Sequence, residues 1–423
     1  AWGSGAFPTR AALDRVAPNH PVYLTAKSGH AGWANSLALQ LAGVNASTQD
    51  VPNGEIVRDA SGEPTGIFLE DAMNLIGSII PQASAGEVAD AMREAIPLAH
   101  RVGLTGVHDF DGARSFQAWQ ILKERNELSL RVSKTIPVYL LEHAIALGLR
   151  SGFGDDWLRI GSVKTFADGA LGPRTALMID PYEGEPPSGN RGIVVTDKEE
   201  MVEHVRKASA AGLSSTIHAI GDKANHDVLD GYEIVRSEEG QRGDSRLRHR
   251  LEHVQLLHPA DSGRLAQLNV IASMQPIHAT SDMLMADKHW GARSASAYAW
   301  RTQLNAGARL AFGSDAPVET FDPLAGIHAA VTRRRADGSP GREGWYAEQR
   351  LTVHEAVYAY TMGAAFAAYA EKYTGSLTPG KLADLVVIDR DIFEIDPMDI
   401  LRAKVVGTIV DGQFAWRDPF FET

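Results

Sequence analysis

The chain has 423 residues, of which 44% are hydrophobic and 22% are charged. This composition is typical of a globular protein with enough apolar material for a large core. Lysine and arginine number 41 against 53 aspartate and glutamate, so the formal net charge is −12, which argues against nucleic acid as the main partner. The sequence has no cysteine, which excludes disulfides and thiolate metal sites.

No segment of the sequence is long and apolar enough to cross a membrane. The longest apolar-leaning stretch without charge, residues 356–370, is shorter than the roughly 18–20 residues required and predicts a buried, alanine-rich helix. No signal peptide opens the sequence, so we expect a cytoplasmic location, and residues 1–5 have the character of an interior segment. The one basic run, at 333–335, is expected to be a solvated helix end.

Short apolar or β-branched runs alternate with helical patterns through the middle of the chain. This alternation predicts parallel strands joined by right-handed crossovers. The sequence has no G-x-G-x-x-G turn, which disfavours an open nucleotide-binding sheet. We therefore predict an α/β fold, a (β/α)₈ TIM-type barrel with one strand missing. The seven predicted strands are residues 105–110, 130–138, 158–166, 214–220, 249–254, 270–274 and 309–313, and the helical stretches include 86–102, 115–126, 198–211, 223–237 and 324–335.

The two ends of the chain do not follow this alternation. Residues 1–85 are rich in turns and predict a subdomain inserted before the strand at 105–110. Residues 375–423 contain two apolar runs, at 384–389 and 405–410, with an Asp-Gly turn after the second, and predict part of a small β-sandwich domain. The barrel itself is expected to occupy residues 86–374.

Four residues with metal-binding or proton-transfer chemistry fall at the ends of predicted strands: Lys164, His218, His253 and Asp315. In a parallel barrel the carboxyl ends of the strands face the active site. Imidazole and carboxylate suit Zn²⁺, Mn²⁺ or Fe²⁺ with an open coordination position. Each residue also has an ordinary structural explanation: a hydrogen-bonded core histidine, a lysine that reaches outward, or an aspartate that caps a turn. Their recurrence at four strand ends favours a metal site.

Lys164 needs a separate explanation, because an ammonium group does not bind a cation. Its nitrogen can react with CO₂ to give a carbamate, whose two oxygens can bridge two metal ions. The sequence shows only a lysine in a suitable place.

Six motifs carry a family resemblance. They are GHAGWANS at 29–36, VKTFADGALGPRTA at 163–176, HAIGD at 218–222, LEH at 251–253, FGSDAPV at 312–318 and GSLTPGKLADLVV at 375–387. In this order they resemble the amidohydrolase superfamily, in the branch that includes N-substituted formamide deformylases. The resemblance extends over essentially the whole chain.

The resemblance implies a metal-dependent hydrolase that acts on C–N bonds of an amide-like small molecule. It implies a divalent metal, with Zn²⁺ the first candidate and one or two ions per site. Lys164, as a carbamate, would bridge the metals, and His218 and His253 would hold the more exposed one. Asp315 would contact the other metal and act as general base on the attacking water.

The sequence departs from the superfamily in one respect. The first barrel strand of that superfamily ends in H-x-H, and no two of the fifteen histidines here are separated by one residue. We expect that the chain opens after this strand. A second hypothesis is therefore a non-catalytic or misassembled barrel, and a third is an ester or phosphoester hydrolase that uses the same chemistry.

Four further residues are candidates for substrate contact. Arg174 follows the strand at 158–166 in a loop, where a loop salt bridge is the alternative. His278 follows the strand at 270–274 and faces the same mouth, where a role in loop structure is the alternative. His30 and Trp33 belong to the inserted segment, in which they would form a lid over the site or pack as core residues.

Two more histidines and the assembly state complete the predictions. His249 lies four residues before His253, so on a strand the two would share a face, and we expect His249 to support the ligands. His108 is expected to pack inside its strand. The acidic surface permits a homodimer.

Overall fold

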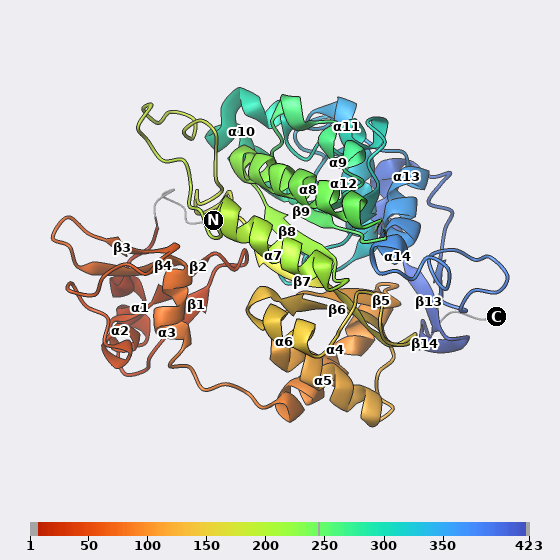
Figure 1. Cartoon of the computed structure of the whole chain (residues 1–423), viewed down its shortest axis with the longest axis horizontal. Coiled ribbons are helices and arrows are strands. Elements are labelled where there is room, and N and C mark those ends of the chain that lie inside the picture. Colours follow the sequence, from red (N-terminus) through yellow and green to blue (C-terminus); the bar gives the residue numbers. More distant parts are fainter. Residues whose placement is uncertain (1–6, 244–245, 420–423) are drawn as a thin grey trace.

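The computed structural model describes residues 7–243 and 246–419, so residues 1–5 and the expectation that rests on them lie outside it. Its centre is a seven-stranded parallel sheet in the order β11-β10-β9-β8-β7-β6-β5 (Figure 1). All seven predicted strands are confirmed, with nearly the predicted bounds. They are β5 (Gly106–Asp109), β6 (Arg131–Pro137), β7 (Leu158–Phe166), β8 (Ser215–Ala219), β9 (Arg250–His253), β10 (Ile271–Met274) and β11 (Leu310–Phe312).

Helices pack on the outer face of this sheet, and local signals set their ends. Ser84 and Glu87 form a capping box before α4 (Ala85–Arg101), and the Asp197 side chain caps α7 (Lys198–Ala210). Gly243, in the left-handed region, ends α8 (Asp222–Arg242). The other helices of this layer are α5 (Ala113–Glu124), α6 (Leu141–Ala146), α9 (Arg264–Gln267), α10 (Pro276–Trp290), α11 (Trp300–Asn305) and α12 (Pro323–Thr332). Short 3₁₀ helices are η1 (Asp71–Met73), η2 (Val138–Leu140), η3 (Pro259–Asp261), η4 (Gly291–Ser296), η5 (Ala347–Gln349) and η7 (Pro397–Arg402).

The sheet is curled. His108 on β5 and Arg250 on β9 are separated by β6, β7 and β8, yet Arg250 Nη1 donates to His108 Nδ1 over 2.8 Å. In a flat sheet, strands in these positions would lie about 19 Å apart, given a spacing of about 4.8 Å per strand. Both side chains therefore point into the interior of a partial barrel, where burial and the neighbouring guanidinium lower the pKa of His108 to about 3. His108 therefore lies inside the partial barrel, paired with Arg250, and it also lines a cavity.

The curl stops short of closure. β5 and β11 are the two end strands of the sheet, and in the described residues they do not pair with each other. This is the arrangement expected of a barrel that lacks one strand. A cavity of about 1180 Å³ lies beside both end strands and reaches the carboxyl ends of the strands, and its lining includes His108, Phe312 and Asp315.

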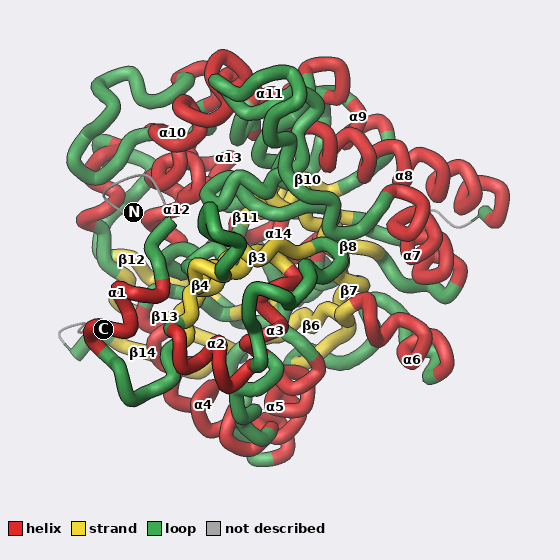
Figure 2. Tube along the Cα trace, turned by 90° about the vertical axis from the view of Figure 1, so that its left-hand side faces the viewer, coloured by secondary structure: helices red, strands yellow, loops and turns green. Residues whose placement is uncertain are grey.

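The N-terminal part forms its own layer at one side of the barrel (Figures 1 and 2). Its antiparallel sheet has the order β1-β2-β4-β3, and its apolar cluster includes the fully buried Phe68 and Ile56. The helices cover this cluster. The elements are α1 (Arg10–Val16), β1 (Tyr23–Thr25), β2 (Ala31–Ala34), α2 (Ser36–Ala42), β3 (Gly54–Arg58), β4 (Pro64–Glu70) and α3 (Asn74–Gly77).

The C-terminal part begins with the predicted alanine-rich helix, which consists of α13 (Val353–Tyr358), a π-helical segment η6 (Ala359–Gly363) and α14 (Ala364–Ala367). Three antiparallel strands follow: β12 (Leu385–Ile388), β13 (Val405–Val410) and β14 (Gln413–Arg417). Thr408 Oγ1 on β13 donates to His100 O on α4 over 2.6 Å, and this hydrogen bond joins the small sheet to the barrel. Within the described residues no helix has the length and apolar character to span a membrane.

The prediction of a solvated helix end at 333–335 was wrong. Helix α12 ends at Thr332, and Arg333 is fully buried, with its guanidinium 4.6 Å from the Trp300 ring centroid and 4.9 Å from that of Trp345. Its Nη1 donates to Tyr298 O over 2.9 Å. Aromatic faces and backbone carbonyls replace water around the cation, and burial lowers the pKa of Arg333 to about 9.

A second buried charge joins two helices of the outer layer. Glu239 on α8, which is 1% exposed, accepts from Ser209 Oγ over 2.6 Å, from His249 Nε2 over 2.8 Å and from Arg236 Nη1 over 2.6 Å. Burial raises the pKa of this carboxyl group, but the His249 and Ser209 hydrogen bonds and the Arg236 charge outweigh it and lower the pKa to about 2. The folded-state pKa lies below that of the unfolded chain. The stability from this group is therefore present above pH about 4.5 and is lost as the pH falls toward 2.

We predict that Glu239→Ala lowers the free energy of unfolding by about 3–5 kcal/mol, because it leaves buried partners without their acceptor. Glu233→Ala on the same helix is the control, since that carboxylate is 65% exposed and its ion pair with Arg264 is worth less than about 1 kcal/mol. Denaturant unfolding at pH 7 measures both changes. Equal effects of the two substitutions would contradict the role assigned to Glu239.

Candidate metal centre

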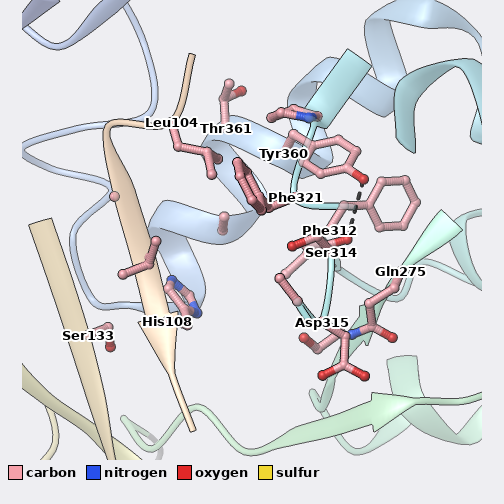
Figure 3. Close-up of a pocket in the computed structure, with 18 of the residues that line it drawn as sticks. Leu104, His108, Ser133, Gln275, Phe312, Ser314, Asp315, Phe321, Tyr360 and Thr361 are labelled. Atoms are coloured by element: carbon pink, nitrogen blue, oxygen red, sulfur yellow. Dashed lines mark hydrogen bonds between the residues drawn. The ribbon is translucent and has the colours of Figure 1, made fainter. Parts of the chain in front are cut away.

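The curled sheet brings the residues predicted as metal ligands to one rim. Lys164 lies on β7, His218 on β8 and His253 at the end of β9, and Asp315 follows β11. The ring centroids of His218 and His253 are 4.6 Å apart. All four residues line the cavity of about 1180 Å³. Figure 3 shows Asp315 at one wall of this cavity, with His108 on the β5 side.

The direction of His253 depends on an unusual backbone conformation. Along β9, Leu251 is buried in the apolar cluster, whereas Arg250 and Glu252 line the cavity, so strand alternation alone would direct residue 253 outward. His253 has φ of +75°, outside strand geometry, and its side chain lies at the cavity. His249 keeps the outward direction and contacts Glu239 on α8. The expectation that His249 and His253 share a face was therefore wrong.

Each of the two central histidines has one ring nitrogen engaged by a hydrogen bond. His253 Nδ1 lies 2.8 Å from Gln275 Oε1, and His218 Nε2 lies 2.9 Å from Gly169 O. Both partners are acceptors, so these nitrogens carry the protons, and His253 Nε2 and His218 Nδ1 are left as lone-pair donors. Burial lowers the pKa of His253 to about 4 and that of His218 well below its usual value. The two rings are thus held neutral, which is the form that binds a metal ion.

The environment of Lys164 favours the neutral amine. Its Nζ lies 4.1 Å from the Phe166 ring centroid and 5.6 Å from that of Phe110. Burial lowers the pKa of Lys164 to about 8, although Glu252 and Asp315 oppose the shift. Only the neutral amine reacts with CO₂, so this environment fits the carbamate that the family resemblance implies.

The geometry adds His278 to the possible metal ligands. One ligand atom from each of His253, His278 and Asp315 can lie within 4.8 Å of the others. His278, near the start of α10, has its Nε2 3.5 Å from Asp315 Oδ2. Burial opposes charge on both groups, but their mutual attraction raises the pKa of His278 and lowers that of Asp315. The sequence suggested substrate contact or loop structure for His278 and no metal ligation, because the nearness of an α10 residue to the loop after β11 has no local sequence signal.

Asp168 was missed by the sequence analysis, although it stands in the motif at 163–176. It is fully buried and accepts three backbone N–H groups, from Ile220 over 3.0 Å, from Gly221 over 2.8 Å and from Leu177 over 2.8 Å. Burial raises its pKa to about 7. Its Oδ1 is 3.5 Å from His218 Nε2, so Asp168 joins the loops that follow β7 and β8 around this imidazole. An Asp-Gly pair directly after a strand was the available signal.

The remaining candidates lie in different places. His30, just before β2, has its ring centroid 5.1 Å from that of His218 and lines the cavity. Trp33 packs with Ile67 and Leu69 in the N-terminal sheet. Arg174 is exposed, and its Nη1 pairs with Glu185 Oε1 over 2.9 Å, which is the loop salt bridge foreseen as the alternative.

The site combines a lysine, neutral imidazoles and a carboxylate at the carboxyl ends of parallel barrel strands. This combination is that of the metal-dependent hydrolases. Comparison with known proteins agrees with this class. The chain belongs to the Amidohydrolase family, whose model matches residues 1–415.

Named relatives and a solved structure are similar over nearly the whole chain. A putative amidohydrolase YtcJ of Bacillus subtilis (strain 168) is 34% identical, over 97% of this chain and 77% of the relative. The N-substituted formamide deformylase of Arthrobacter pascens is 32% identical, over 96% and 75%. An uncharacterized metal-dependent hydrolase from Pyrococcus horikoshii OT3 superposes with a TM-score of 0.75 at 28% identity, over 93% of this chain and 76% of that chain.

We predict that Asp168→Asn destabilises the fold by about 1–3 kcal/mol for each backbone N–H that loses its acceptor. The same change should weaken the binding of a divalent metal ion, probed with Zn²⁺, about 10- to 100-fold, because the loop that orients His218 is released. Asp180→Asn, at a 78% exposed carboxylate on the neighbouring loop, is the control. Denaturant unfolding and Zn²⁺ titration measure the two effects. An Asp168→Asn protein with unchanged stability and affinity would refute the role of Asp168.

Proposed function

We propose that this protein hydrolyses the C–N bond of an amide-like small molecule with the help of a divalent metal ion, Zn²⁺ being the first candidate. The observation that carries the proposal is the state of the two central histidines. His218 and His253 are buried, neutral and adjacent, and each has one nitrogen held by a hydrogen bond and one left as a lone-pair donor. The name of the Arthrobacter pascens relative, an N-substituted formamide deformylase, supports an amide substrate.

The residues of the site have distinct roles in this proposal. His218 Nδ1 and His253 Nε2 would hold the metal together with Lys164 as a carbamate. When bound, the metal polarises the substrate carbonyl and lowers the pKa of water toward about 7. Asp315, whose carboxylate is kept ionised by His278 and His253, accepts the proton of the attacking water and delivers it to the leaving nitrogen. The rings of Phe110 and Phe166 lie beside Lys164 Nζ.

A second candidate is a barrel without catalytic activity. It is favoured by the absence of an H-x-H motif from the sequence and by the unpaired end strands β5 and β11 in the described part of the chain. His218, His253 and a carbamate of Lys164 supply three protein ligands, which suffice for one ion. We therefore expect one bound ion in this chain.

We predict that His218→Ala and His253→Ala each lower Zn²⁺ affinity at least about 10-fold, because each removes a lone-pair donor. His143→Ala, at an exposed histidine on α6, is the matched control and should bind as the parent protein does. Zn²⁺ titration followed by elemental analysis measures affinity and stoichiometry. Unchanged binding in both site variants would exclude these ligands.

Added bicarbonate tests whether Lys164 forms a carbamate. At pH about 8, where part of Lys164 is the neutral amine, added bicarbonate should tighten Zn²⁺ binding in the parent protein and have no effect on Lys164→Ala. Two tightly bound ions per chain, or an affinity indifferent to bicarbonate, would contradict the proposed ligand set.

Activity tests the reaction itself. In a panel of N-substituted formamides, carboxylic esters and phosphoesters, we expect hydrolysis of the formamides, and Asp315→Asn should lower kcat about 10²- to 10⁴-fold with little change in KM. Turnover confined to an ester would identify the third hypothesis of the sequence analysis. No turnover of any compound by the metal-loaded protein would favour the non-catalytic barrel.

A further inference from the structure

One residue that lines the cavity, His30, has no part in the proposed metal chemistry, and neither has its partner Glu70. His30 directly precedes β2 and Glu70 ends β4 of the N-terminal four-stranded sheet, so neither belongs to the barrel. His30 Nδ1 lies 2.8 Å from Glu70 Oε2, and both side chains are largely buried, at 13% and 7% exposed. The His30 ring faces His218, with the centroids 5.1 Å apart.

Two contacts hold Glu70 in place. Its other oxygen, Oε1, accepts from Thr175 Oγ1 over 2.6 Å, in the loop that follows β7. A Cβ added to Gly169 in that loop would lie 2.2 Å from Glu70 Oε1, so only glycine allows the carboxylate to approach this closely. Glu70 is thus fixed against the same loop whose Gly169 carbonyl orients His218. The position of His30 relative to the metal ligands is set by these contacts.

The partners of Glu70 decide which nitrogen of His30 carries the proton. A carboxylate only accepts hydrogen bonds, so the 2.8 Å contact requires a proton on His30 Nδ1. In the neutral ring, Nε2 is then a hydrogen-bond acceptor. Within the described residues Nε2 has no hydrogen-bond partner, and His30 lines the cavity that holds His218, His253 and Asp315.

We propose that His30 Nε2 accepts a hydrogen bond from the N–H group of the substrate amide, and that Glu70 is the positioning residue that fixes the tautomer of His30. This inference rests on the proposed amide hydrolysis. It names the substrate class, an amide with a free N–H beside the scissile carbonyl. A tertiary amide or an ester has no such donor and leaves the largely buried His30 without this hydrogen bond, so the protein discriminates against it.

The selectivity test compares an N-alkylformamide with its N-methylated derivative. The parent protein should prefer the N–H compound in kcat/KM by about 10- to 100-fold, the effect of one hydrogen bond in a buried site. His30→Phe, which keeps a ring against His218, should bring the ratio close to one by slowing the N–H compound only. His20→Phe, at an exposed histidine of the same subdomain, should leave the ratio unchanged. An unchanged ratio in His30→Phe, or a loss of bound Zn²⁺ in that variant, would overturn the inference.

A second measurement does not depend on turnover. In protein labelled with ¹⁵N-histidine, the signals of His30 are those missing in His30→Phe. We expect them to show a proton on Nδ1 in the parent protein and in Glu70→Gln, whose amide oxygen can still accept, but a loss of this preference in Glu70→Met. The N–H formamide should shift the Nε2 resonance, and the N-methylated compound should not. A proton on Nε2, or equal shifts with both compounds, would overturn the inference.

The two measurements separate the inference from the proposed function. The parent protein could hydrolyse neither formamide while the N–H compound alone shifts the Nε2 resonance. That result would support the proposed contact of His30 and contradict the proposed hydrolysis. If hydrolysis occurs with no preference for the N–H compound, the proposed function stands and the role of His30 fails.

Discussion

The curl of the parallel sheet is the constraint on which the candidate site depends. Parallel pairing places the carboxyl ends of successive strands at one rim, and curling turns that rim into a mouth. The hydrogen bond from Arg250 to His108 spans the barrel interior and ties β9 to β5. Lys164, His218 and His253 are separated by tens of residues in sequence, but they lie on the adjacent strands β7, β8 and β9 and line one cavity. A flat sheet of the same strands would not bring Asp315 near Lys164.

Around this mouth, hydrogen bonds made by loops determine how each side chain is presented. Gly169 and Gln275 engage one nitrogen of His218 and His253 respectively, and the other nitrogen remains a lone-pair donor. Asp168 in turn holds the backbone of the loops on either side of His218. Burial lowers the pKa values of both imidazoles and keeps them neutral. Neutral imidazoles are the form that binds a cation. The N-terminal sheet takes part in this arrangement through Glu70, which contacts both His30 and Thr175.

Two further charged side chains are buried away from the candidate site. Arg333 is enclosed by two tryptophan rings and backbone carbonyls, and Glu239 by a serine, a histidine and an arginine. Neither lies at the cavity. These groups join helices of the outer layer, and most of their partners come from other elements, such as Ser209 on α7 and Trp300 on α11. The charge pattern of the sequence therefore predicted solvent exposure for Arg333, although the residue is buried.

The sequence by itself determined the parallel-strand architecture and indicated the residues of the candidate site. Alternating apolar runs and helical patterns predicted all seven barrel strands, and the motifs at 163–176, 218–222, 251–253 and 312–318 indicated Lys164, His218, His253 and Asp315 as candidates. Strand periodicity and short motifs are local properties, so they can be read from the sequence.

Only the tertiary structure decided the contacts between distant segments. The positive φ of His253 separates it from His249, and the approach of α10 to the loop after β11 pairs His278 with Asp315. The packing of the N-terminal sheet against the loop after β7 places Glu70 beside His30. Such pairs depend on how whole elements pack, and packing joins residues that have no relation in the local pattern of the sequence.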